Sequence, residues 1–229
     1  MTEVMKAKLI FLSMFLLVLA GPIHGQYLHP KISGKQTQIR NVVMLPAKVE
    51  IVRQSMKGPE GMAAESDLLS TRVSQLTSEA LAAKHIIVSA GATPATSEAD
   101  TQQKYTVADL QARYNALLPK IAKKRKDVKK GRFSLGDEVL NLNLDKSADA
   151  IVFIRGQGQK LTKGKTAFTL LVGGLPAYLQ LTIGVVDAHT GEVLVFTNPL
   201  TRGDATGAND KSLLKAIENS LKKLPPNGQ

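Results

Sequence analysis

The chain has 229 residues and no cysteine, and its 30 Lys and Arg residues outnumber 19 Asp and Glu residues, giving a formal net charge of +11. Without cysteine it forms no disulfide and lacks the residue that carries the lipid of a bacterial lipoprotein, so its stability must come from a packed core. Tryptophan is absent and aromatic residues make up only 4% of the chain, which argues against aromatic platforms for sugars or nucleobases.

The first 25 residues have the pattern of a secretory signal peptide. Two lysines precede twelve uncharged residues, Leu9 to Ala20, and small or turn-forming residues follow. Cleavage after Ala20 and cleavage after Gly25 both fit this pattern. A retained membrane helix would need about 20 apolar residues, and Pro22 ends the run earlier. We therefore expect export through a cleaved signal peptide, to the periplasm or the cell exterior, and a soluble mature chain.

A lead-in and the first strand of one folded domain are predicted next. Residues 26–38 are polar and show no periodicity, which predicts a flexible lead-in. Residues 39–225 are expected to form a single domain. Its first strand is predicted from Ile39 to Val52, a stretch rich in β-branched residues in which Pro46 marks a bulge, an edge or an end.

The centre of the domain predicts two helices with a short strand between them. Apolar residues recur at spacings of three and four from Leu69 to Ala83, which predicts the first helix. His85 to Gly91 predicts a short buried strand, and residues 92–105 predict a loop because they are rich in Thr, Ser, Ala and Asp.

A capping box predicts the start of the second central helix. The Thr106 hydroxyl can accept a hydrogen bond from a free backbone N–H, while the Asp109 carboxylate reaches back to the helix start. The apolar face of this helix continues to Ile121, and Pro119 is expected to kink or divide it. A further helix is expected near residues 135–144.

The C-terminal third predicts three strands and a last helix. Residues 148–159 and 192–196 are β-branched runs, and residues 178–186 alternate between apolar and polar side chains. An apolar stripe from Leu213 to Leu224 predicts an amphipathic helix that two prolines end. The order of elements predicts the α/β class: a single domain with a mixed β-sheet, flanking helices and a C-terminal amphipathic helix.

Gly164, Lys165 and Thr166 come close to a nucleotide-binding P-loop, but the spacing does not fit. The motif places four residues between its first glycine and the Gly-Lys-Thr, whereas five residues separate Gly158 from Gly164. Two glycines and a proline soon after Thr166 would interrupt the long helix that should follow. We therefore interpret the segment as a strand end and a basic loop, and we expect no cofactor.

Asp187, His189 and Glu192 lie together between two predicted strands. Their oxygen and nitrogen atoms suggest a metal site, but ligands within one tight turn would not converge easily on one ion. A hairpin turn is the better interpretation, because Gly191 supplies a position with positive φ and Asp187 can accept hydrogen bonds from turn amides. We therefore assign Asp187 and Gly191 structural roles and expect no metal.

Catalytic signatures are absent from the sequence. The mature histidines, His29, His85 and His189, are widely separated, and neither a Gly-x-Ser-x-Gly elbow nor a His-Glu-x-x-His motif accompanies them. The sequence therefore predicts a protein that is not an enzyme and has no catalytic residues to assign. An exported hydrolase whose site is dispersed in sequence is the alternative.

The strongest local feature is a basic segment, residues 120–132, with eight basic residues and one acidic residue. It can be the solvated end of a helix, where cations suit the negative helix terminus. Alternatively, it contacts an anionic surface of the cell envelope; nucleic acid is the least favoured partner because no recognition motif accompanies the charge. The candidate contact residues are Lys120, Lys123, Lys124, Arg125, Lys126, Lys129, Lys130 and Arg132.

The order of these features resembles a group of bacterial envelope proteins. A secretory leader is followed by a strand that enters a proline (VVMLP), an ADAIVF strand, a VVDAHTGEVLVF hairpin and a terminal helix (LLKAIENSLKKLP). In this order the chain is similar to the curli-secretion channel subunit and to the lipoprotein activators of penicillin-binding proteins. It departs from them by lacking the lipid-bearing cysteine.

The resemblance implies an α/β domain that acts through protein contacts in envelope assembly, without catalysis. We therefore expect an exported, non-enzymatic binding or assembly protein of the bacterial cell envelope. Its expected partner is an envelope protein or an anionic envelope polymer or lipid, and a homo-oligomer is left open.

Overall fold

The computed structural model describes residues 26–90, 98–142, 147–171, 177–203 and 210–226. The predicted signal peptide therefore lies outside the described residues. Among the described residues, no helix has both the length and the apolar character needed to cross a membrane. The elements in chain order are β1 (Gln26–Leu28), α2 (Pro30–Ser33), β2 (Asn41–Met44), β3 (Lys48–Ser55), β4 (Gly58–Gly61), α3 (Ala63–Ala82), β5 (Ile87–Ala90), α4 (Glu98–Lys123), η1 (Arg125–Lys130), η2 (Asp137–Leu142), β6 (Ala150–Leu161), α5 (Lys163–Leu171), β7 (Tyr178–Asp187), β8 (Val193–Thr197), β9 (Leu200–Arg202) and α6 (Asp210–Leu221).

The sheet has nine strands of mixed direction, and this confirms the predicted α/β class. Its main path is β1-β8-β7-β6-β2-β5, while β3 and β4 extend it beside β6 and β9 pairs with β7. β6 is parallel to β2 and β3 but antiparallel to β7. The C-terminal amphipathic helix is α6, whose buried residues are Leu213, Ile217 and Leu221.

Pro46 separates two strands that share one long neighbour. β2 ends two residues before this proline, and β3 begins two residues after it. β2 pairs with the first part of β6, and β3 pairs with the part from Arg155 to Leu161. The single strand predicted from 39 to 52 is therefore two strands, broken at the proline, which has no backbone N–H to donate to a ladder.

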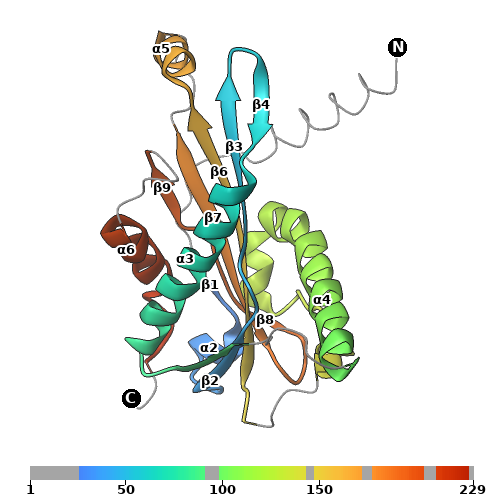
Figure 1. Cartoon of the computed structure of the whole chain (residues 1–229). Coiled ribbons are helices and arrows are strands. Elements are labelled where there is room, and N and C mark those ends of the chain that lie inside the picture. Colours follow the sequence, from blue (N-terminus) through green and yellow to red (C-terminus); the bar gives the residue numbers. More distant parts are fainter. Residues whose placement is uncertain (1–25, 91–97, 143–146, 172–176, 204–209, 227–229) are drawn as a thin grey trace.

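Helices cover both faces of the sheet (Figure 1). On one face, α3 and α6 pack on alternate residues of β6 and β7, among them Val152, Leu181 and Ile183. On the other face, α4, η1 and η2 pack on the intervening residues, among them Ile151 and Phe153. The alternation follows from the strand itself, because successive side chains point to opposite faces.

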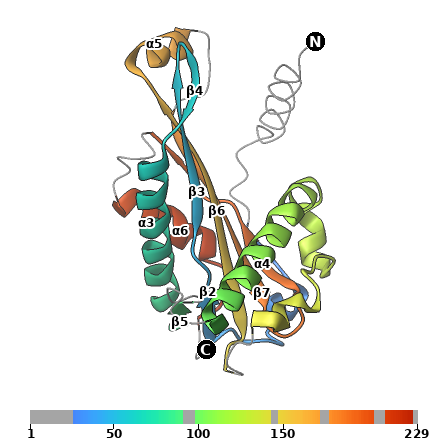
Figure 2. The ribbon, with the colours of Figure 1, turned by 45° about the vertical axis from the view of Figure 1, so that its right-hand side comes forward.

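One end of the sheet extends beyond the helices and forms an arm. We define the arm as residues 52–61 and 159–171, which comprise the end of β3, β4, the end of β6 and α5. Both ribbon views show it projecting past the end of α3, with α5 at its tip (Figures 1 and 2). We call the rest of the described chain the body.

The structure differs from the prediction at the N-terminal segment. Residues 26–38, predicted as a flexible lead-in, contain β1 and α2, and β1 pairs antiparallel with β8 from Gln26 to Leu28. The His29 N–H also donates to the Leu194 carbonyl at 2.8 Å. A three-residue strand of this kind is held by its partner strand and is too short for its own sequence to show a periodicity.

The central elements also need correction. α4 begins at Glu98, so Thr106 lies inside the helix and does not cap it, and Pro119 does not divide it. The strand β5 was predicted to be buried, but it pairs with β2 alone and its Ile87 side chain is 64% exposed. The helix expected near residues 135–144 is the 3-10 helix η2.

Candidate functional site

The basic segment, residues 120–132, comprises the last turn of α4, η1 and the two residues after it (Figure 2). Ile121 and Val128 are both 0% exposed and fix its backbone to the core beneath α4. Because these two side chains occupy the inner face, the basic side chains are turned outward. Seven of them are exposed: Lys120, Lys123, Lys124, Lys126, Lys129, Lys130 and Arg132.

Arg125 and Asp127 differ from their neighbours in the segment. The Arg125 side chain is half-buried, and within the described part of the chain its Nε has no hydrogen-bond partner. Asp127, the single acidic residue, lies 3.8 Å from both Lys130 Nζ and Arg132 Nη1. One carboxylate between two cations leaves the segment with a strong positive excess.

The segment packs against the N-terminal strand. Lys129 Nζ lies 5.9 Å from the centre of the Tyr27 ring, within cation–π range. Gly131 has φ 64° and lies against His29, so a Cβ at this position would be 2.4 Å from His29 Nε2. The glycine therefore permits the close approach of η1 to the segment that contains β1 and α2.

His29 serves as the cap of α2. Its Nδ1 accepts a hydrogen bond from the Lys31 N–H at 3.1 Å. The side chain is buried, and this burial lowers the pKa of His29, with Lys31 acting in the same direction and Glu192 against it. The neutral ring is the form that caps, since Nδ1 must be free of a proton to accept.

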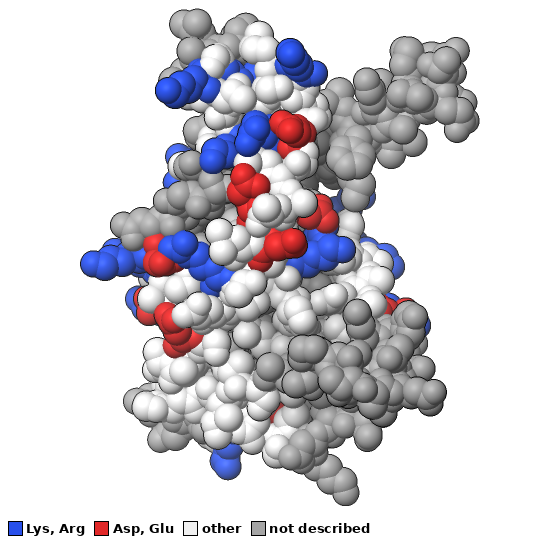
Figure 3. Space-filling model, viewed as in Figure 1, with Lys and Arg blue, Asp and Glu red and all other residues white. Residues whose placement is uncertain are grey.

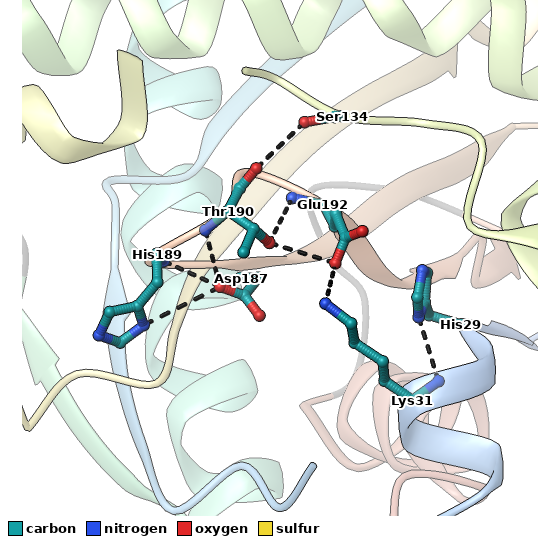
Figure 4. Close-up of polar contacts among 7 residues, drawn as sticks. All are labelled: His29, Lys31, Ser134, Asp187, His189, Thr190 and Glu192. Carbon is teal, nitrogen blue, oxygen red and sulfur yellow. Dashed lines mark hydrogen bonds and ion pairs between the residues drawn. The ribbon is translucent and has the colours of Figure 1, made fainter. Parts of the chain in front are cut away.

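A polar cluster joins α2 to the turn between β7 and β8 (Figure 4). Asp187 Oδ1 accepts from the backbone N–H groups of His189 and Thr190 at 2.8 and 2.9 Å. Glu192 forms an ion pair with Lys31 and accepts from Thr190 Oγ1. The hydrogen bond from Lys31 lowers the pKa of Glu192, and the same bond raises the pKa of Lys31.

Gly191 closes this turn in the left-handed region. Its φ is +68°, its N–H donates to the Asp187 carbonyl at 3.0 Å, and a Cβ here would lie 2.2 Å from the Gly136 carbonyl oxygen. Leu135 N–H also donates to the Gly191 carbonyl at 2.8 Å. The turn is thus locked against the chain that leads into η2.

Metal and hydrolase geometries find no support in these positions. Within the described residues, no three His, Cys, Asp or Glu side chains come together in a way that could hold a metal ion. His189 is exposed and its Nδ1 is 3.9 Å from Asp187 Oδ1, while His85 lies in an exposed turn before β5. No histidine lines the groove of about 690 Å³ between β3 and α3, whose lining residues are 47–52, 61–63, 66, 67, 70 and 71.

The Gly164-Lys165-Thr166 motif lies within α5, which begins at Lys163. In a P-loop the glycines precede the helix, so that backbone N–H groups can surround a phosphate. Here β6 continues to Leu161 and one residue separates it from α5. The expected basic loop is therefore a nine-residue helix, which the sequence missed because Gly164 occupies its first turn.

Comparisons with known proteins give distant similarity. No family model and no curated protein matches this chain. Among solved structures, it is similar to the PelC dodecamer from Paraburkholderia phytofirmans, with a TM-score of 0.44 and 10% identity over 89% of this chain and 96% of that chain. It is also similar to lipoprotein GNA1162 from Neisseria meningitidis, with a TM-score of 0.37 and 12% identity over 80% of this chain and 96% of that chain. At these scores the structures define no family for the chain.

Proposed function

We propose that this chain is an exported, non-enzymatic binding or assembly protein of the bacterial cell envelope, and that its basic segment contacts an anionic partner. The observation that carries the proposal is the exposure of seven cationic side chains on a backbone anchored by Ile121 and Val128. The compartment rests on the signal-peptide pattern of residues 1–25.

The charge of the segment is not explained by folding. Solvated surface charges contribute about 0–1 kcal/mol to stability, and like charges spaced three or four residues apart on a helix repel each other. Lys120 stands in this relation to Lys123 and Lys124. The favourable interaction of cations with the end of α4 is a partial offset of about 0.3–1 kcal/mol. An anionic partner gives the remaining charge a role.

Binding to an immobilised acidic polymer, polyglutamate, at several salt concentrations tests the proposal. Replacing Lys120, Lys123, Lys124 and Lys126 with Gln should abolish most binding, and wild-type binding should fall steeply as salt screens the field over roughly 8–10 Å. Replacement of Lys48, Lys215, Lys222 and Lys223 with Gln removes the same charge from other exposed positions and serves as the control.

Two results would contradict the proposal. If the segment variant binds polyglutamate as tightly as the wild type, the segment is only a solvated helix end. If both quadruple variants lose binding equally, the net charge of the chain acts without a localised contact. Circular dichroism on each variant verifies that the fold is retained.

A further inference from the structure

The tip of the arm forms a second surface with its own charge and shape. At the turn between β3 and β4, Met56 is 69% exposed and Lys57 is exposed beside it. α5 begins next to this turn, because the Thr162 N–H donates to the Gln54 carbonyl at 3.1 Å and α5 makes its main contact with β3. An exposed apolar side chain and exposed cations are therefore neighbours at the far end of the molecule (Figure 1).

The charge of the arm is strongly biased. Five basic residues stand against Glu60 alone, a net charge of +4: Arg53, Lys57, Lys160, Lys163 and Lys165. Glu60 is already paired with Arg53 at 3.6 Å. Figure 3 shows Lys and Arg at this end, above a region of mixed acidic and basic residues over the middle of the same face. The cations of the arm are thus separated from the basic segment, which lies on α4 and η1.

α5 is a short helix at the tip of the arm, and its main contact is with β3. Isolated helices shorter than about 12–15 residues are marginal in water, and α5 has nine residues. Its sequence, KGKTAFTLL, joins two lysines to a run that contains Phe168, Leu170 and Leu171. Cationic residues next to apolar ones in the sequence are the composition of a segment that lies at a membrane interface.

We infer that the arm tip docks on the surface of an anionic lipid bilayer, with its lysines at the headgroups and Met56 at the level of the acyl boundary. A bilayer fits better than a soluble polyanion because the tip combines cations with exposed apolar surface. This inference goes beyond the proposed function, since it concerns a different surface from the basic segment and commits to a lipid bilayer as the partner.

A single fluorophore at the tip tests the inference directly. The chain has no cysteine, so Met56→Cys and Leu68→Cys each create one labelling site, and the two parent side chains are matched at 69% and 67% exposure. Leu68 lies on α3 in the body. An environment-sensitive dye at position 56 should shift to the blue on vesicles of phosphatidylglycerol and phosphatidylcholine, and the same dye at position 68 should not. Vesicles of phosphatidylcholine alone should produce no shift.

Charge removal gives the second measurement. Each lysine near an anionic surface contributes roughly a fivefold gain in affinity, so Lys57→Gln with Lys163→Gln should weaken vesicle binding roughly 10- to 30-fold. Lys222→Gln with Lys223→Gln at the end of α6 is the matched control and should change binding less than about twofold. The protein recovered from the exported fraction is used throughout.

The inference is overturned if the dye responds equally at positions 56 and 68, or if the tip variant binds vesicles as tightly as the control. Loss of vesicle binding in the basic-segment variant alone would also overturn it, because the bilayer contact would then be α4 and η1. The tip variant should bind polyglutamate as tightly as the wild type, so the two proposals fail separately.

Discussion

The body and the arm share the strand β6 but surround it differently. In the body, Ala150 to Ile154 are at most 5% exposed, because helices lie on both faces of the strand. In the arm the same strand reads Gln159, Lys160 and Leu161, all partly exposed. The helices cover only the first part of β6, and the strand's sequence changes from apolar to polar where that cover ends.

This difference separates the source of stability from the candidate contact at the tip. The body holds the buried apolar area, which is the dominant favourable contribution to folding. The arm holds few fully buried side chains and a positive excess, so most substitutions there should have little effect on the free energy of unfolding. Each prediction below pairs a body residue with a residue that should not show the same effect.

The largest expected effect is on β6 itself. Phe153 is 1% exposed and its ring stacks on Tyr114 with centroids 4.8 Å apart. Phe153→Ala should lower the free energy of unfolding by about 3–5 kcal/mol, because a large cavity replaces the ring. Gln157→Ala, four residues along at an exposed position, should change it by less than about 0.5 kcal/mol. Chemical denaturation measures both, and similar losses would show that β6 is as tightly packed at Gln157 as at Phe153.

Two glycines carry the comparison further. Gly191→Ala places a Cβ 2.2 Å from a carbonyl oxygen at a φ of +68°, so it should destabilise the fold by about 2–4 kcal/mol. Gly164→Ala in α5 meets nothing within 4 Å and should be neutral or stabilise by up to about 1 kcal/mol, since alanine favours helices. Thermal unfolding distinguishes the two. A large loss at Gly164 would mean that the arm packs against something at this point.

The edge of β3 is covered in two ways, one in each region. In the arm it pairs with β4, whereas in the body its N–H groups donate to serine hydroxyls of α3. Val49 N–H donates to Ser70 Oγ at 2.9 Å, and that hydroxyl donates to the Ser66 carbonyl at 2.7 Å. Ser66 and Ser74 act in the same way on Ile51 and Ala47.

Removing one hydroxyl from this series tests its contribution. Ser70→Ala leaves the Val49 N–H without an acceptor and should cost about 1–2 kcal/mol. Thr71→Ala, at the next and exposed position of α3, should cost less than about 0.5 kcal/mol. Hydrogen exchange at the Val49 amide should accelerate in the first variant only. Unchanged exchange would show that β3 does not depend on the serine contact.

Hydrophobic periodicity predicted the strands and helices that bury one apolar face. Leu179 and Ile183 of β7, and Leu213 of α6, were all expected on apolar faces and are at most 1% exposed. Asp187 and Gly191 were assigned to a turn because their residue types favour such turns. A local sequence pattern is enough to predict a feature when that feature depends on one residue type at one position, as a turn with positive φ depends on glycine.

The features that the sequence analysis did not predict depend mostly on residues elsewhere in the chain. β1 depends on pairing with β8, and its three residues have no pattern of their own. The first turns of α4 were predicted to be a loop because residues 92–105 are rich in Thr, Ser, Ala and Asp, although Glu98 and Asp100 suit the positive start of a helix. The ion pair between Lys31 and Glu192 joins residues 161 positions apart, so sequence alone offered no signal for it.

The smallest expected effect is a pH dependence confined to the body. Burial lowers the pKa of His29, so above its ordinary value of 6.5 the ring is neutral in both the folded and the unfolded chain and carries no penalty. As the pH falls below 6.5, the unfolded chain takes up a proton that the folded chain resists, and stability declines. Glu192 acts at lower pH: its stabilising charge is present above its ordinary value of 4.5 and is lost as the pH falls through its lowered pKa.

His29→Asn separates these two groups, because an asparagine oxygen can still cap α2 but does not titrate. The variant should be less stable at pH 7.5, since a buried ring is lost, yet its melting temperature should fall less between pH 7.5 and 5.5 than that of the wild type. His189→Asn, at an exposed position of the neighbouring turn, removes a histidine but keeps the cap of α2 and serves as the control. If the melting temperature of His29→Asn falls as much as that of the wild type over this range, a group other than His29 causes the pH dependence.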